Sequence, residues 1–325
     1  MVVVRVVYGG PAYWTGLITG CGGRADYLSG GPALPFTLSH AAAVLPAMRR
    51  DATGRGRLVP AVLTAGSFAP DLTYYAASVV PGAMEFGAVT HSFAGVATVD
   101  VLIAWALAGL WLLLREPLVA LLPRARQGRP AALLRCGVPR ARVRAVPAAW
   151  WYVSAVLGAL THVVWDAFTH HDRWGTRLIP AIGRVHPAGE PLYSWLQYAS
   201  SVAGAVVIVL FLVRALRCMP GGEPVGVPVL SARDRCGALV VIGGCALAGA
   251  VQRAARWWGH RGASAGPWEL VPTLCFGVGT GVLLGLFLYA VGVRVWRPGP
   301  VPGGPGEAGG PVGTVAADRG RPVSR

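Results

Sequence analysis

The sequence predicts an all-α protein, a polytopic membrane helical bundle of about six transmembrane helices plus a short N-terminal helix that dips into the membrane. Of 325 residues, 54% are hydrophobic and only 13% are charged, whereas soluble domains average about 25% charged residues. Several apolar runs approach the roughly 20 residues that a helix needs to cross a bilayer. The arginines fall between these runs. We therefore expect a multi-pass protein of the cell membrane.

The apolar runs define the expected helices in order. Residues 36–48 are too few to cross, because such a helix spans roughly 20 Å and the hydrocarbon core is about 30 Å thick. Six longer runs follow, and each is predicted to cross the bilayer: 58–80, 95–114, 146–169, 194–213, 237–252 and 270–293. The first of these is interrupted at Pro70, since proline breaks helices, and the fifth is short.

The distribution of arginine predicts the orientation through the positive-inside rule. Segment 115–144 carries eight arginines and segment 49–57 carries four, so we expect both on the cytoplasmic side. Alternation assigns the other connections, with 214–236 inside and 170–193 and 253–269 outside. Because the formal charge of +15 lies largely in such segments, we exclude nucleic acid as a partner and predict the lipid bilayer instead.

The two ends differ from the centre of the chain. Residues 1–34 are rich in glycine and lack a helical period, which predicts disorder or an over-extended N-terminus. Residues 297–325 are rich in Pro, Gly and Arg, which predicts a disordered tail. Residues 35–296 form the predicted integral membrane domain. Its ionisable residues concentrate in 36–175, so we expect the functional site there and anchor helices in 194–293.

Five ionisable residues lie in or beside apolar runs, where a charge costs about 2.5–3.5 kcal/mol on insertion scales. Such residues usually face a protein interior or a water-filled cavity and have partners. They are His40, Asp71, His91, His162 and Asp166. Three imidazoles and two carboxylates are a ligand set for a divalent metal. Mixed nitrogen and oxygen ligands suit zinc first, and also manganese or iron.

The spacing of these residues favours a shared site. His162, Asp166 and His170 recur every four residues, so on a helix they form one stripe with neighbours about 5–6 Å apart. An HxxxD pair can present an imidazole and a carboxylate to one metal, as the two histidines of HExxH do. The helical rise places His40 about 13 Å and Asp71 about 20 Å above the inner boundary. We therefore expect the candidates to converge in the outer half of the bundle.

Each candidate also has a simpler interpretation. The HxxxD pair can hydrogen-bond to neighbouring helices, and His40 can be a structural hydrogen-bond donor. Asp71 can cap the next helical turn, and His91 can be an interfacial histidine. Asp100 is a weaker candidate, either as a carboxylate that orients an imidazole or as an acid at a helix start.

Four blocks of sequence carry a resemblance to a known family. They are LPFTLSHAAAVLP (34–46), GSFAPDLTYY (66–75), HSFAG (91–95) and GALTHVVWDAFTH (158–170). Together they resemble a bacterial integral membrane family, domain-of-unknown-function family 4184, over residues 35 to about 295. Members of that family typically open with Met-Pro-Phe-Thr-Leu-Ser-His, which implies a start near Leu34.

In its His/Asp pattern that family is similar to the YdjM-like membrane-bound metal-dependent hydrolases, and more remotely to zinc-dependent phospholipase C. The resemblance implies metal ligation by the same five residues: His40, Asp71, His91, His162 and Asp166. The chain has too few ligands for a three-zinc phospholipase site and no matched catalytic glutamate. Phospholipase activity is therefore not carried over.

Three functions stay open at this point. The first is a metal-dependent hydrolase of a lipid or another membrane-proximal ester or phosphoester. A divalent metal would lower the pKa of a bound water, with Asp166 or Asp71 as the base if it is not fully ligated. The second is a transporter or proton-relay protein, although transport folds often have matching halves and these halves differ. The third is a structural protein whose polar cluster holds helices together.

Overall fold

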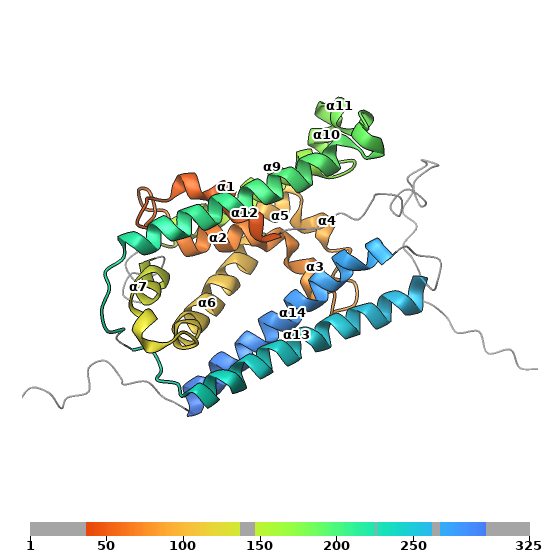
Figure 1. Cartoon of the computed structure of the whole chain (residues 1–325). Helices are drawn as coiled ribbons and strands as arrows, with labels where there is room; N and C mark the ends of the chain where they lie inside the picture. The colour runs from red at the N-terminus through yellow and green to blue at the C-terminus, as the bar shows by residue number, and fades with distance from the viewer. Residues whose placement is uncertain (1–36, 137–146, 225, 262–266, 297–325) are drawn as a thin grey trace, which may run out of the picture. The chain divides into compact units, whose positions relative to one another are not determined.

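The structure is a computed structural model that describes residues 37–136, 147–224, 226–261 and 267–296. In these ranges every regular element is a helix, apart from one isolated bridge between Met48 and Gly54. The predicted terminal segments 1–34 and 297–325 lie outside the described residues. The chain is an all-α membrane helical bundle (Figure 1).

Five helices of the described residues are long and apolar enough to cross a membrane. They are α6 (Val99–Ala120), α9 (Ala148–Thr169), α12 (Leu192–Cys218), α13 (Ala232–Arg261) and α14 (Pro267–Trp296). Short helices precede α6, namely α4 (Gly87–Thr90) and α5 (Phe93–Ala97), and others lie in the connections after it: α7 (Gly128–Cys136), α10 (Trp174–Leu178) and α11 (Ala181–Arg184). These lengths and hydropathies imply association with a lipid bilayer.

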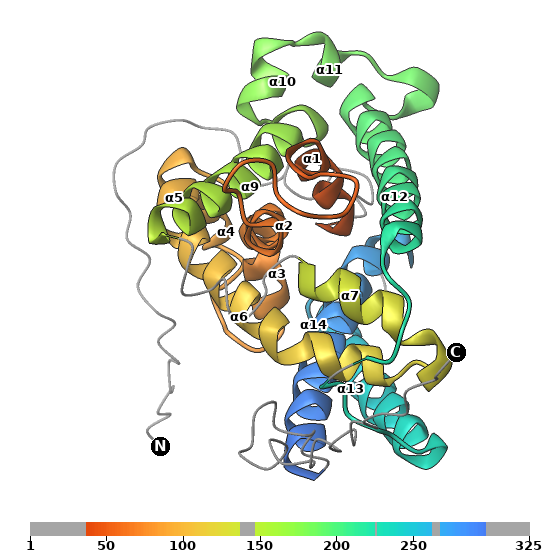
Figure 2. The ribbon, with the colours of Figure 1, turned by 90° about the vertical axis from the view of Figure 1, so that its left-hand side faces the viewer.

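The run at 58–80 accounts for the difference from the six predicted spans. It folds as α2 (Pro60–Phe68), the 3-10 turn η4 (Ala69–Asp71) and α3 (Leu72–Ala76). Pro70 cannot donate a backbone hydrogen bond, which explains the break. The nine residues of α2 cover only about 13.5 Å, so α2 ends inside the bundle. Figure 2 shows α2 nearly end-on, between α1, α9 and α6.

The predicted membrane-dipping helix at 36–48 is also divided. It consists of η2 (Thr37–His40), α1 (Ala41–Val44) and η3 (Leu45–Ala47), which pack against α2 and α12. The prediction for 237–252 was too short, since α13 continues to Arg261. Arginine favours helix, so α13 extends past its apolar run at both ends.

Glycines allow α2 and α9 to pack with their backbones in contact. A Cβ on Gly158 would lie 2.3 Å from the carbonyl oxygen of Leu63, and a Cβ on Gly66 would lie 2.5 Å from that of Ala155. Small residues at membrane helix interfaces permit such an approach. The rest of this interface is filled by alanine and valine. The close contact sets the spacing between Asp71, which follows α2, and the ionisable residues of α9.

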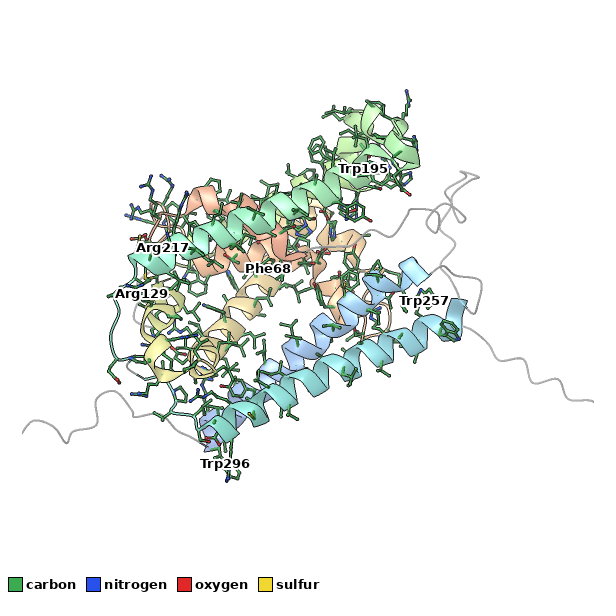
Figure 3. All side chains as sticks on the ribbon, in the orientation of Figure 1. Phe68, Arg129, Trp195, Arg217, Trp257 and Trp296 are labelled. Carbon is green, nitrogen blue, oxygen red and sulfur yellow. The ribbon has the colours of Figure 1, made fainter. Side chains whose placement is uncertain are left out.

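The arginine-rich segments share one end of the bundle. Glu116 on α6 lies 3.6 Å from guanidinium nitrogens of both Arg135 and Arg294. Arg124 pairs with Glu223 at 2.8 Å, which joins segments 115–136 and 214–236. Figure 3 shows Arg129 and Arg217 at this end and Trp195 and Trp257 at the other. Segments predicted to lie on one side of the membrane are thus neighbours, and the orientation itself stays a prediction.

Candidate metal centre

The candidate centre lies where α9 meets three breaks in the helical chain. His162 and Asp166 stand one turn apart near the end of α9. Asp71 is the last residue of η4, so the break at Pro70 places its carboxylate beside α9. His91 follows the end of α4, and His40 ends η2. The structure therefore brings all five predicted residues together.

Four donor atoms form a compact group: Asp71 Oδ1, His91 Nε2, His162 Nε2 and Asp166 Oδ2. Nε2 of His91 lies 3.5 Å from each of the two carboxylate oxygens, and Nε2 of His162 lies 3.4 and 3.3 Å from them. One ligand atom from each residue lies within 4.8 Å of all the others. Ligands at about 2.0–2.1 Å from a tetrahedral zinc stand roughly 3.3–3.4 Å apart, which matches the four nitrogen–oxygen separations.

Backbone carbonyls orient the two imidazoles. Nδ1 of His162 lies 2.8 Å from the carbonyl oxygen of Ser67, and Nδ1 of His91 lies 2.9 Å from that of Gly87. A carbonyl can only accept, so each Nδ1 carries a hydrogen, and in the neutral ring that binds metals each Nε2 has a lone pair. Metal-binding histidines typically have such a partner on the second nitrogen. Both Nε2 lone pairs therefore face the group of four donor atoms.

Asp71 is held by its second oxygen. The hydroxyl of Thr37 donates to Asp71 Oδ2 at 2.6 Å, and the hydroxyl of Tyr75 donates to Thr37 at 3.3 Å. These bonds leave Asp71 Oδ1 for the group of four. The sequence did not point to Thr37 as a site residue, although it lies in the first block of the family resemblance.

His40 lies beside the group of four rather than within it. Its Nε2 is 3.4 Å from Oδ1 of Asp166, the other oxygen of that carboxylate. Its ring stacks on His162, with centroids 3.9 Å apart and an interplanar angle of 25°. Burial, and then the charge that His162 can carry, lower the pKa of His40 to about 4. His40 is therefore a neutral imidazole at neutral pH, the form that binds metals.

The cluster is buried and its polar atoms are not satisfied by the protein. The five side chains are at most 9% exposed. Four of the buried atoms without a hydrogen-bond partner in the described residues belong to this cluster: His40 Nδ1, His91 Nε2, His162 Nε2 and Asp166 Oδ1. The nitrogen–oxygen distances of 3.3–3.5 Å exceed the 2.7–3.2 Å of N–H···O bonds. A cation between these atoms would satisfy them, so the group could hold a metal ion.

His170 and Gln197 extend the cluster toward its exposed side. Nδ1 of His170 lies 3.4 Å from Asp166 Oδ1, and the His170 side chain is 29% exposed. Its Nε2 lies 3.1 Å from the amide nitrogen of Gln197 on α12. The four-residue stripe on α9 predicted the position of His170. Gln197 was missed, because a single glutamine in an apolar run carries no spacing signal.

Asp100 on α6 does not orient an imidazole. Both of its carboxylate oxygens are buried without a hydrogen-bond partner in the described part of the chain. The Nδ1 atoms of His91 and His162 are already bound to backbone carbonyls. The orienting role considered for Asp100 is therefore filled by Gly87 and Ser67.

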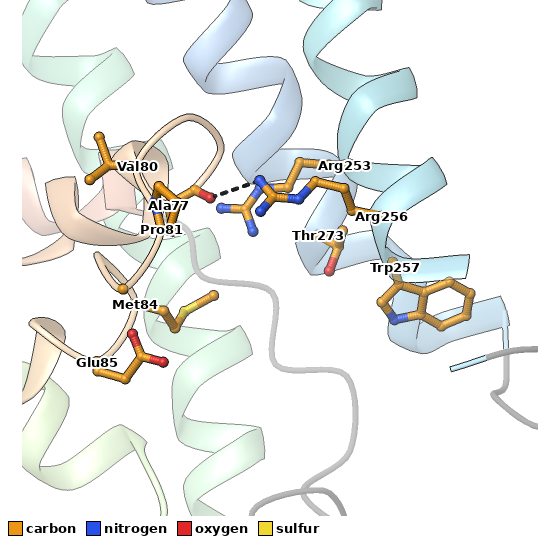
Figure 4. Close-up of a pocket in the computed structure, with 10 residues that line it drawn as sticks. Ala77, Val80, Pro81, Met84, Glu85, Arg253, Arg256, Trp257 and Thr273 are labelled. Atoms are coloured by element: carbon orange, nitrogen blue, oxygen red, sulfur yellow. Dashed lines mark hydrogen bonds between the residues drawn. The ribbon is translucent and has the colours of Figure 1, made fainter. Parts of the chain in front are cut away.

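A cavity of about 440 Å³, which no cluster residue lines, lies between the loop after α3 and the helices α13 and α14 (Figure 4). Arg253 donates to the carbonyl of Tyr74, whose ring centroid is 5.6 Å from that of His91. Arg256 donates to the carbonyl of Ser78 at 3.1 Å. These arginines donate hydrogen bonds to backbone carbonyls at the C-terminal end of α3, which lack partners within the helix. The bonds hold α13 against the segment that follows Asp71.

Comparison with known proteins identifies the family. A family model described as a domain of unknown function (DUF4184) matches residues 34–291, a range that contains every residue of the cluster and nearly all of the five long helices. The chain belongs to this family. No curated protein and no solved structure matches it.

Proposed function

We propose that this DUF4184 member is a membrane-bound metal-dependent hydrolase that acts on a lipid or another membrane-proximal ester or phosphoester. The observation that supports it is the group of four donor atoms, whose nitrogen–oxygen separations of 3.3–3.5 Å and overall spread within 4.8 Å suit the ligands of one divalent ion. Two imidazoles and two carboxylates suit zinc, with manganese or iron as alternatives. The resemblance to YdjM-like hydrolases drawn from the sequence leads to the same proposal.

Charge balance favours a divalent ion over a bare cluster. Asp71 and Asp166 are buried, and in the described residues their ionic contacts are to histidines alone. Two carboxylates without a cation would be costly in a low-dielectric interior. One divalent ion neutralises both.

The residues around the donor group have distinct tasks. A divalent metal supplies Lewis acidity and lowers the pKa of a bound water. His91 and His162 present fixed lone pairs because their Nδ1 hydrogens are bound to carbonyls. Each carboxylate has one oxygen outside the group, Asp71 Oδ2 and Asp166 Oδ1, and a general base is one of these two atoms. Proton acceptance there would serve ester hydrolysis.

The position of the cluster suits a substrate at the membrane surface. Asp166 lies three residues before the end of α9, which corresponds to about 4.5 Å along the helix. The arginine-rich segments lie at the other end of the bundle. By the positive-inside rule the cluster then faces the outer surface of the cell membrane. His170, part-exposed at the helix end, forms the side on which a substrate would arrive.

Metal analysis of the detergent-purified protein tests the proposal. Wild type is expected to hold metal after dialysis, and His162→Ala is expected to lose it while staying in the membrane. His186→Ala is the matched control, because His186 is an exposed histidine outside the cluster. Wild-type protein that holds no more metal than His162→Ala after incubation with zinc, manganese or iron would refute the metal centre.

Activity is measured separately in proteoliposomes. Hydrolysis of a fluorescent phospholipid and of a nitrophenyl ester should be present in wild type, absent in Asp71→Asn and abolished by a chelator. A metal-containing protein inactive on both substrate classes would leave the metal centre and refute the hydrolase. Proton flux in the same vesicles without bound metal would favour the relay alternative.

A further inference from the structure

We infer that Asp166 bridges two metal ions, and that Asp166 Oδ1, His40 and His170 form a second site beside the group of four. The inference rests on the proposed function, because it takes the first site as given. In this arrangement the second ion contacts the substrate, and its charge determines which class of substrate is favoured.

The two oxygens of Asp166 face different sets of ligands. Oδ2 belongs to the first group, at 3.3 Å from His162 Nε2 and 3.5 Å from His91 Nε2. Oδ1 lies 3.4 Å from His40 Nε2 and 3.4 Å from His170 Nδ1. Both separations from Oδ1 equal those between ligands of a small divalent ion, about 3.3–3.4 Å. Paired hydrolytic metals stand roughly 3.5–4 Å apart, a distance that a bridging carboxylate can hold.

Hydrogen bonding explains His170, whose Nδ1 lies 3.2 Å from the Thr169 hydroxyl oxygen, but it does not explain the positions of Asp166 Oδ1 and His40. Asp166 Oδ1 is buried and has no hydrogen-bond partner among the described residues. The two imidazoles beside it stand at 3.4 Å, beyond the range of an N–H···O bond. A structural His40 would place a ring nitrogen within about 3 Å of an acceptor. Instead its Nδ1 is also unpartnered, and its ring stacks on a ligand of the first site.

Gln197 is suited to orient His170. For Nδ1 to bind a metal, the hydrogen of His170 must be on Nε2. Nε2 lies 3.1 Å from the Gln197 side-chain amide, which is buried on α12. An amide turned by half a rotation presents its oxygen at this position, because the two ends of the group have nearly the same shape. Gln197 would then accept the Nε2 hydrogen, and the Nδ1 lone pair would face both Asp166 Oδ1 at 3.4 Å and the Thr169 hydroxyl at 3.2 Å.

The two sites differ in how open they are. The first has four protein ligands, which is typical of a closed site, whereas three protein ligands leave a position for water or substrate. The second site has three, and one of them, His170, is 29% exposed. The second ion therefore contacts the substrate. Asp166 is then fully ligated, and the general base becomes Asp71 rather than Asp166.

The charge of the pair selects the substrate class. Two divalent ions bring four positive charges, and Asp71 and Asp166 supply two negative charges. The remaining positive charge lies in a buried site, where an anionic group would neutralise it. A phosphoester is anionic and a simple carboxylic ester is neutral. The second site thus favours a phosphoester, and a phospholipid head group is the source nearest to the membrane.

Metal stoichiometry tests the inference and separates it from the proposed function. Wild type is expected to hold two ions per chain, His170→Ala one, and His162→Ala fewer than one. His171→Ala is the matched control, since His171 is the adjacent exposed histidine, and should hold two. Gln197→Leu should weaken the second ion by roughly 10–100-fold, as loss of an orienting partner does. One ion in both wild type and His170→Ala would overturn the second site and leave the first intact. No ion in wild type would overturn both.

Paramagnetic resonance of the manganese-loaded wild type gives a measurement that needs no variant to fold. Two Mn²⁺ ions bridged by Asp166 should give an exchange-coupled spectrum, and a single-ion spectrum at saturating manganese would overturn the inference. Binding of inorganic phosphate and binding of vesicles of anionic phospholipid are each compared between wild type and His170→Ala. The comparison separates a free phosphate from a lipid head group as the ligand. Binding of neither to wild type would overturn the substrate assignment.

Discussion

Replacing Gly158 with alanine should open the centre by separating α2 from α9. The new Cβ would lie 2.3 Å from the carbonyl oxygen of Leu63 and 2.9 Å from Cα of Gly66. Both neighbours are backbone atoms of α2, which cannot rotate away as a side chain can. Ordinary contact begins at 3.4 Å, so the two helices must move apart by about 1 Å.

This movement acts directly on the donor atoms. His162 lies one turn after Gly158, and Asp71 follows α2 by three residues. A full 1 Å shift would lengthen the 3.4 Å distance between His162 Nε2 and Asp71 Oδ1 to about 4.4 Å, against roughly 3.3–3.4 Å for a zinc tetrahedron. It would also break the hydrogen bond between His162 and Ser67, now 2.8 Å. Overpacking costs about 1–3 kcal/mol, and the lost bond adds about 0.5–1.5 kcal/mol.

The assay combines zinc affinity, measured by competition with a chelating dye in detergent, with the thermal unfolding midpoint. Gly158→Ala should bind zinc at least about tenfold more weakly, since tenfold corresponds to about 1.4 kcal/mol, and should unfold at a lower temperature. Gly66→Ala should do the same from the other helix. Gly109→Ala on α6 is the control, because a Cβ there meets no atom within 4 Å. If Gly158→Ala matched wild type in both measurements, the α2–α9 contact would not set the centre.

Two further predictions concern Asp100 and the orientation. Asp100→Asn should retain metal content and membrane insertion. It should unfold at the same or a higher temperature, because the buried carboxylate has no partner among the described residues and burying charge is costly. Loss of metal in this variant would show that Asp100 supports the centre. In a cysteine-free background, Val185→Cys should react with an impermeant thiol reagent in intact cells and Ala125→Cys should not, because the arginine-rich end is expected inside. The opposite labelling pattern would reverse the orientation.

The positions of the cluster residues were accessible to sequence reasoning because ionisable side chains are rare in apolar runs. His162, Asp166 and His170 lie on one stripe because α9 is a regular helix through all but the last of them. The sequence could not predict that the two carboxylate oxygens of Asp166 face different sets of histidines. This arrangement depends on the side-chain angle and on the stacking of His40 against His162. Whether these residues bind metal stays a prediction.

The partners of the imidazoles were beyond sequence reasoning for a different reason. Ser67 and Gly87 act through their carbonyl oxygens, and every residue carries that group. Only the three-dimensional fold shows which carbonyls are free to accept. Ser67 lies in the last turn of α2, where carbonyls lack intrahelical partners, whereas the Gly87 carbonyl also accepts the backbone N–H of His91. The break that made the span at 58–80 hard to predict therefore supplies the acceptor for His162.

The surroundings of the cluster weigh against the two alternative functions. In a structural polar cluster, buried groups are nearly all hydrogen-bonded, but here several buried atoms are unpartnered in the described residues. A proton relay needs polar groups that continue toward the opposite side of the membrane. Toward the arginine-rich end, the core between α2, α6 and α9 is instead filled by apolar residues such as Val62, Ala104 and Ala155. A proton arriving at the cluster would meet this apolar layer. A cluster that ends there, with its part-exposed histidine at the other side, is suited to bind a cation and act on a substrate from the membrane surface.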